Sequence, residues 1–116
     1  MIRLTHVDAL NAALMLKYVV EGDAHYLERQ LAEECSEYVH AVLKILRVDA
    51  GETPMPVDEA MENCIEELAD VILSADIVYA YYLEQYPDVA DRLDEIMQEK
   101  RLRILDRVME KREGKW

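Results

Sequence analysis

The fold is decided by two long stretches, residues 24–49 (AHYLERQLAEECSEYVHAVLKILRVD) and residues 57–86 (VDEAMENCIEELADVILSADIVYAYYLEQY). Neither contains glycine or proline, and each is far longer than an ordinary strand. Apolar residues recur in both at the spacing of one helix face. Only a short loop, from Gly51 to Pro56, separates them, so they are predicted to form two antiparallel neighbouring helices.

Shorter signals add a helix before these two. Thr5, followed three residues later by Asp8, resembles a capping box and indicates a helix over about residues 6–21, ending before Gly22. Asp23 is the expected N-cap of the second helix.

A fourth helix follows the long third one. Pro87 should end the third helix, because proline cannot continue the backbone hydrogen bonding. Asp88 is the expected cap of a helix over about 88–113, which stops before Gly114. The chain of 116 residues is therefore predicted to be one all-α domain, a four-helix bundle.

Composition narrows the function classes. A net charge of −12 argues against a general nucleic-acid footprint, although residues 100–116 carry 7 of the 13 basic side chains. No basic segment precedes an apolar run at the N-terminus, and no apolar stretch approaches a membrane span. Cys35 and Cys64 form no CxxC pair and are expected to be small buried residues in a reducing compartment. A cytoplasmic protein that binds neither nucleic acid nor membrane is expected.

Two carboxylates of the second helix occupy unusual positions. At about 100° per residue, Glu34 lies within about 20° of Leu27 and Ala41, in the middle of the apolar stripe. Glu37 lies about 60° away, at the edge of that stripe. An unpaired charged carboxylate is costly there, so a cation is expected to compensate it.

The third helix repeats this pattern. Glu67 lies within about 80° of several apolar residues, and Asp70 lies about 60° from it. Facing helices with carboxylates three residues apart bring four carboxylates together. Such hard oxygen ligands suit magnesium, or manganese, and magnesium commonly acts through substrate phosphates. Acidic residues three positions apart are also common on solvated helix faces. The prediction of a metal site therefore depends on the inward placement of both pairs.

The motifs EECSE at 33–37 and EELAD at 66–70 resemble the EExxE…ExxD signature of the all-alpha nucleoside triphosphate pyrophosphohydrolases, the MazG-like superfamily. The continuation DVILSADIVYA at 70–80 is also typical of that superfamily. The likeness extends from about Tyr26 to Tyr82. It implies a homodimer or homotetramer. Residues 57–86 are expected near the subunit interface, because this helix is apolar nearly all round and four helices cannot cover every face of it.

The resemblance also implies individual roles. Glu34, Glu37, Glu67 and Asp70 match the metal ligands, and Glu33 matches the leading acid that flanks the site. Lys100 and Arg107 match the positions of a Lys and an Arg that hold phosphates in similar proteins, but Ile104 stands where the family has Asn. Lys44 could also reach a phosphate, although an ion pair with a nearby acid is the favoured interpretation.

The implied reaction is magnesium-dependent cleavage of a (deoxy)nucleoside triphosphate to monophosphate and pyrophosphate, as in nucleotide-pool house-cleaning. Water attacks the α-phosphorus in line, and no particular Glu is assigned as general base. Glu37 and His40 have the ExxH spacing of di-iron bundles, but the third helix offers no second ExxH. Two alternatives stay open: phosphoribosyl-ATP hydrolysis, and a non-catalytic acidic helical module that dimerises. The sequence does not identify the preferred base.

Overall fold

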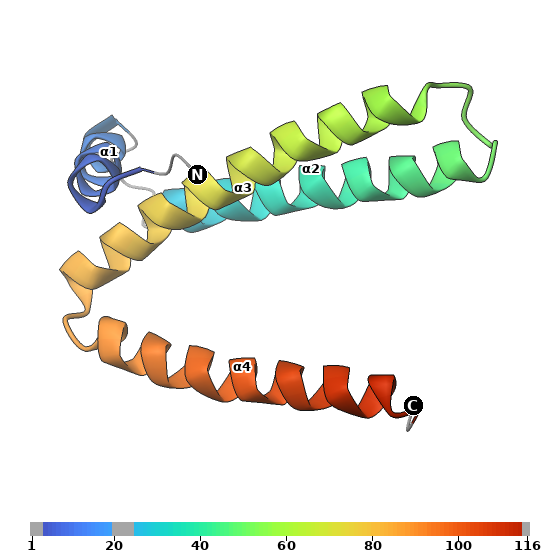
Figure 1. The fold of residues 1–116 in the computed structure, drawn as a ribbon. Helices are drawn as coiled ribbons and strands as arrows, with labels where there is room; N and C mark the ends of the chain where they lie inside the picture. The colour runs from blue at the N-terminus through green and yellow to red at the C-terminus, as the bar shows by residue number, and fades with distance from the viewer. Residues whose placement is uncertain (1–3, 20–24, 115–116) are drawn as a thin grey trace. The chain divides into compact units, whose positions relative to one another are not determined.

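A computed structural model describes residues 4–19 and 25–114, without the side chains of residues 15–19. Within these ranges the chain forms helices and no strand, as predicted (Figure 1). The helices are α1 (His6–Val19), α2 (Tyr26–Asp49), α3 (Val57–Gln85) and α4 (Val89–Arg112). None of these described helices is long and apolar enough to cross a membrane.

The first helix starts as the sequence indicated. The backbone N–H of Asp8 donates a hydrogen bond to Oγ1 of Thr5 over 3.1 Å, which satisfies one of the free N–H groups at the start of α1. The predicted end of this helix, at residue 21, lies outside the described residues, and so does Asp23.

The fourth helix corrects one prediction. Asp88 occupies the N-cap position of α4, but its side chain forms no capping hydrogen bond. Its backbone has φ −83° and ψ −4°, in the helical region, whereas a capping side chain normally requires an extended backbone. α3 does end just before Tyr86 and Pro87, as predicted.

The turn after α2 is built around Gly51, which has φ +74°. The N–H of Gly51 donates to the carbonyl of Val48, and the N–H of Glu52 donates to the carbonyl of Arg47. This pair of bonds is a Schellman motif, which stops a helix where a residue adopts the left-handed conformation. The chain can then reverse direction through residues 52–56 and enter α3.

The chain divides into two compact units, residues 1–81 and residues 82–116. In the first unit, α2 and α3 run side by side in opposite directions from the loop that joins them, and α1 contacts α2 (Figure 1). The second unit holds the end of α3, the turn at Pro87, and α4. The prediction of one single domain stays a prediction.

The buried residues of the described chain are small. Alanines predominate among them, and no large side chain there is fully buried. Ala41 on α2 is 3% exposed and Ala60 on α3 is 1% exposed. Both helices therefore carry an alanine at a position that is closely packed. The complete buried set among the described residues is Ala9, Ala13, Leu27, Ala41, Val48, Ala60, Cys64, Val78 and Ala80. Cys64 is thus buried as predicted, whereas Cys35 is exposed and its predicted burial is wrong.

One apolar stripe of α3 stays partly uncovered within the described residues. At about 100° per residue it lies on the side of the helix away from Glu67. Its members Met61, Ile65, Leu68 and Tyr79 are exposed, whereas Ile72 and Ala75 are half-buried. Neighbouring exposed apolar side chains of this kind often mark a contact surface.

Gly51 provides a test of the turn. A Cβ at this position would meet no atom within 4 Å, so Gly51→Ala changes only the strain of the left-handed backbone. We expect the variant to lose about 1–2 kcal/mol of unfolding free energy, measured by urea denaturation. Gly51→Asn should lose less, because asparagine tolerates this conformation. Equal losses in both variants would contradict this account of the turn.

Candidate metal centre

The hairpin of α2 and α3 brings three of the predicted carboxylates together. One carboxylate oxygen from each of Glu34, Glu67 and Asp70 lies within 4.8 Å of the others. Glu34 belongs to α2, and the other two belong to α3. Helix geometry explains their meeting, because Glu34 lies 15 residues before α2 ends and Asp70 lies 13 residues after α3 begins. At about 1.5 Å per residue, both stand at nearly the same height above the loop.

The three side chains differ in their exposure. Glu34 and Glu67 are half-buried, whereas Asp70 is exposed. Among the described residues, Oε2 of Glu34 and Oε2 of Glu67 are buried atoms without a hydrogen-bond partner. Buried carboxylate oxygens normally accept hydrogen bonds, so two unpaired ones in a single cluster require an explanation.

Gln30 donates a hydrogen bond to the Glu34 side chain. Its Nε2 donates to Oε1 of Glu34 over 3.1 Å, from one turn earlier on α2. Sequence reasoning missed this residue, although its i, i+4 spacing to Glu34 was a usable signal. Gln30 orients the carboxylate and leaves its second oxygen free.

The electrostatics of Glu34 reflect this crowding. Desolvation raises the pKa of Glu34 above its ordinary value of 4.5, and the hydrogen bond from Gln30 acts in the opposite direction. The nearby charges of Glu37 and Asp70 raise the pKa further. These carboxylates therefore repel one another, and bound positive charge would stabilise such a site.

A divalent cation fits these residues. The donor set consists of carboxylate oxygens alone, which suits magnesium or manganese and not a metal that prefers sulfur or imidazole. The two unpaired buried oxygens are available as ligand atoms. Glu34, Glu67 and Asp70 are thus the residues that would hold such an ion.

Two other predicted acids lie near this group. Glu37 is exposed and interacts electrostatically with Glu34, but it is not one of the three residues whose oxygens converge. Glu33 is also exposed. The structure therefore places Glu37 at the edge of the cluster, and the roles of both residues stay predictions.

A groove of about 530 Å³ adjoins the cluster between α2 and α3. It shares Glu67 with the cluster and also contains Lys44, which was predicted to bind substrate or pair with an acid. Among the described residues Lys44 has no ion-pair partner, so the favoured pairing is not formed. Sequence reasoning missed most of the lining, which comprises Glu37, His40, Ala41, Lys44, Arg47, Asn63 and Glu67.

The predicted phosphate-binding residues of the last helix lie in the second unit. Lys100 and Arg107 are both exposed on α4, and so is Ile104. Their part in phosphate binding stays a prediction.

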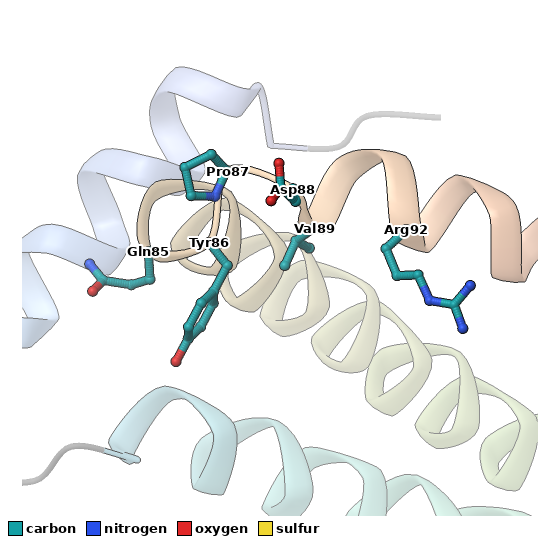
Figure 2. Close-up of a pocket in the computed structure, with 6 residues that line it drawn as sticks. All are labelled: Gln85, Tyr86, Pro87, Asp88, Val89 and Arg92. Atoms are coloured by element: carbon teal, nitrogen blue, oxygen red, sulfur yellow. The ribbon is translucent and has the colours of Figure 1, made fainter.

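A second hollow, of about 430 Å³, lies at the turn between α3 and α4 (Figure 2). Tyr86 stands there with its ring in edge-to-face contact with Tyr82, at a centroid distance of 6.1 Å. Arg92 forms an exposed ion pair with Glu95 over 3.2 Å, a contact that contributes little to stability. None of the predicted site residues lines this hollow, which is formed by Gln85, Tyr86, Pro87, Asp88, Val89 and Arg92.

Comparisons with known proteins identified no relative of this chain. No protein-family model matches the chain, and searches of curated proteins and of solved structures find no match either. The chemistry of the site consequently rests on its own residues.

The raised pKa of Glu34 predicts how stability depends on pH and metal. A raised pKa means that the charged carboxylate destabilises the folded state, an effect that grows as pH rises through the folded pKa. Without metal, Glu34→Gln should therefore raise the melting temperature at about pH 7. The gain should disappear as pH falls below 4.5, where the wild-type group is itself protonated.

Added magnesium should reverse the order of the melting temperatures of the wild type and Glu34→Gln. The wild type should gain melting temperature on addition of magnesium chloride, whereas Glu34→Gln should gain little, because one ligand is lost. Glu62→Gln is the matched control, since it removes the same charge from an exposed position of α3 outside the cluster. A control that behaves like Glu34→Gln would show that net charge alone, and not the cluster, is responsible.

Proposed function

We propose that this protein is a magnesium-dependent nucleoside triphosphate pyrophosphohydrolase of the MazG-like type. The observation that carries the proposal is the convergence of Glu34, Glu67 and Asp70, with two buried oxygens that have no hydrogen-bond partner among the described residues. Magnesium prefers such ligands and commonly binds substrate phosphates at the same time. The EExxE…ExxD resemblance supports the same assignment.

In the proposed reaction the metal and the protein have different roles. Glu34, Glu67 and Asp70 would hold the magnesium, which would neutralise charge on the phosphates and make a water molecule more acidic. The protein holds the carboxylates in place through the α2–α3 hairpin and orients Glu34 through Gln30. A water oxygen bonds to the α-phosphorus while the bond to the α–β bridging oxygen breaks. The products are nucleoside monophosphate and pyrophosphate.

The substrate class follows from what the cluster can recognise. A magnesium ion held by the carboxylates would bind the triphosphate, which all nucleoside triphosphates share, so the protein should cleave several canonical or damaged (deoxy)nucleoside triphosphates. Diphosphates should be poorer substrates, because they offer fewer phosphate oxygens. Pyrimidine deoxynucleotides are the favoured substrates on family likeness, and Lys100 and Arg107 are the proposed phosphate contacts from α4.

Assembly is the second part of the proposal. The exposed stripe of α3 around Ile65 supplies apolar surface that a second copy of the chain would cover. We therefore expect a dimer or tetramer, inside the cell, in the form of a helical bundle.

A non-catalytic interaction module is the competing function, and the same exposed stripe favours it. A module that only dimerises has no need for unpaired carboxylate oxygens in its interior, so it explains the stripe but not the cluster.

A panel of triphosphates assayed with magnesium tests the function. Chromatography should show monophosphate and pyrophosphate as products. Orthophosphate and diphosphate would refute cleavage between the α- and β-phosphates, and preferential turnover of phosphoribosyl-ATP would assign that activity instead. Absence of turnover for every nucleotide would favour the interaction module.

Removal of a ligand tests the residues. Glu34→Ala and Asp70→Ala should each lose well over tenfold in kcat/KM, because each removes a ligand that positions the metal and phosphates. Glu62→Ala is the control, since it removes an exposed acid of α3 on another face and should stay active. Retention of more than about a tenth of wild-type activity in Glu34→Ala, a cost of only about 1.4 kcal/mol, would contradict the site.

Light scattering tests the assembly. The wild type should be at least a dimer at micromolar concentration, and Ile65→Glu should yield a smaller species, because it places a charge within the α3 stripe. Glu62→Gln, one turn from Ile65, should leave the size unchanged. A monomeric wild type would remove the proposed interface.

A further inference from the structure

The groove beside the carboxylate cluster has a charge pattern of its own. Glu37 and Glu67 lie at the end that adjoins the cluster, whereas Lys44 and Arg47 lie further along α2. Asn63 faces them from α3, one turn before Glu67. The groove is therefore acidic at the metal-binding end and basic toward the loop that joins the helices.

Helix geometry places the basic side chains on the same groove as the cluster. Lys44 lies 5 residues before α2 ends, and Asn63 lies 6 residues after α3 begins, so both stand at the same height above the loop. Side chains of a helix lean toward its N-terminus, which on α2 is the direction of Glu37 and Glu34. This tendency favours conformations in which Lys44 and Arg47 extend along the groove toward Glu37.

These two cations are not neutralised by local ion pairs. Among the described residues, neither Lys44 nor Arg47 has an ion-pair partner. Lys44 is half-buried and Arg47 is exposed, so both cations can pair with an anion that enters the groove. Asn63 adds an amide that can donate to the same anion.

We propose that the groove binds the terminal phosphates of the substrate, so that Lys44, Arg47 and Asn63 hold the pyrophosphate that leaves. This inference rests on the proposed function and fixes the direction of the substrate. The α-phosphate lies at the carboxylate cluster, the β- and γ-phosphates extend toward the loop, and the nucleoside extends away from the loop.

The distribution of charge along a triphosphate agrees with this orientation of the substrate in the groove. A triphosphate carries more negative charge than one divalent ion neutralises, and the excess is greatest at its terminal phosphate. An acidic end that binds metal, followed by a basic end that binds bare phosphate oxygens, is complementary to that distribution. A monophosphate product has no group that reaches the basic end.

Calorimetry with inorganic pyrophosphate tests the inference without turnover. The full chain is titrated with pyrophosphate in magnesium chloride. Lys44→Gln/Arg47→Gln should weaken binding at least tenfold, about 1.4 kcal/mol, because two charge-assisted contacts are lost. Arg101→Gln/Arg103→Gln is the matched control, since it removes the same net charge from exposed positions of α4 and should shift the dissociation constant less than about twofold.

Titration with nucleoside monophosphate is the second binding measurement. Its dissociation constant should be the same in the wild type and in Lys44→Gln/Arg47→Gln, because it does not reach the basic end of the groove. Circular dichroism confirms that the variants fold, and the single variant Arg47→Gln, at an exposed position, gives a second test with an intermediate loss.

The outcomes separate this inference from the proposed function. Unchanged pyrophosphate affinity in Lys44→Gln/Arg47→Gln, with triphosphate cleavage intact in the wild type, overturns the groove assignment alone. Equal loss in the α4 control also overturns it, because general charge is then responsible. If the wild type binds pyrophosphate through these residues but cleaves no nucleotide, the groove assignment holds and the hydrolase proposal fails.

Discussion

Mutual repulsion among carboxylates held between α2 and α3 is the constraint around which the hairpin is arranged. Glu34, Glu67 and Asp70 place oxygens within 4.8 Å of one another, and burial raises the pKa of Glu34. The two helices tolerate this because they are held together elsewhere, where alanines such as Ala41 and Ala60 are buried. Packing thus opposes electrostatics, and a cation bound as proposed would relieve this conflict.

The turn at Gly51 makes that arrangement possible. Its Schellman motif stops α2, and the short loop then sets the register of α3 against α2. Since both helices rise equally per residue, residues at similar distances from the loop face one another. The same register aligns Glu34 with Asp70 at one height and Lys44 with Asn63 at another. One turn therefore positions both the cluster and the adjoining groove.

The described chain leaves much apolar surface uncovered while burying mainly small side chains. Burial of alanines alone contributes less free energy than burial of leucine or isoleucine, because less apolar area leaves water. The α3 stripe is thus a natural place for additional stabilisation through a second copy. Assembly of this kind would hold α3, and with it Glu67 and Asp70, in a fixed position.

The sequence by itself determined the helices and their ends. Local chemistry sets these features: the Thr5 hydroxyl at the start of α1, the left-handed glycine after α2, and Pro87 after α3. Asp88 was the exception, because a capping bond also requires a backbone conformation that the residue type does not impose. Helical periodicity was likewise enough to place Glu34 and Glu67 on inward faces.

Only the tertiary structure decided which of these side chains meet. Periodicity gives the direction of a side chain around its own helix, but not its height against a neighbouring helix or its rotamer. The sequence therefore grouped Glu37 with the other acids, whereas three oxygens converge without it. It also gave no indication that Arg47 and Asn63 line the groove beside Glu67, since their proximity depends on the register of α2 against α3.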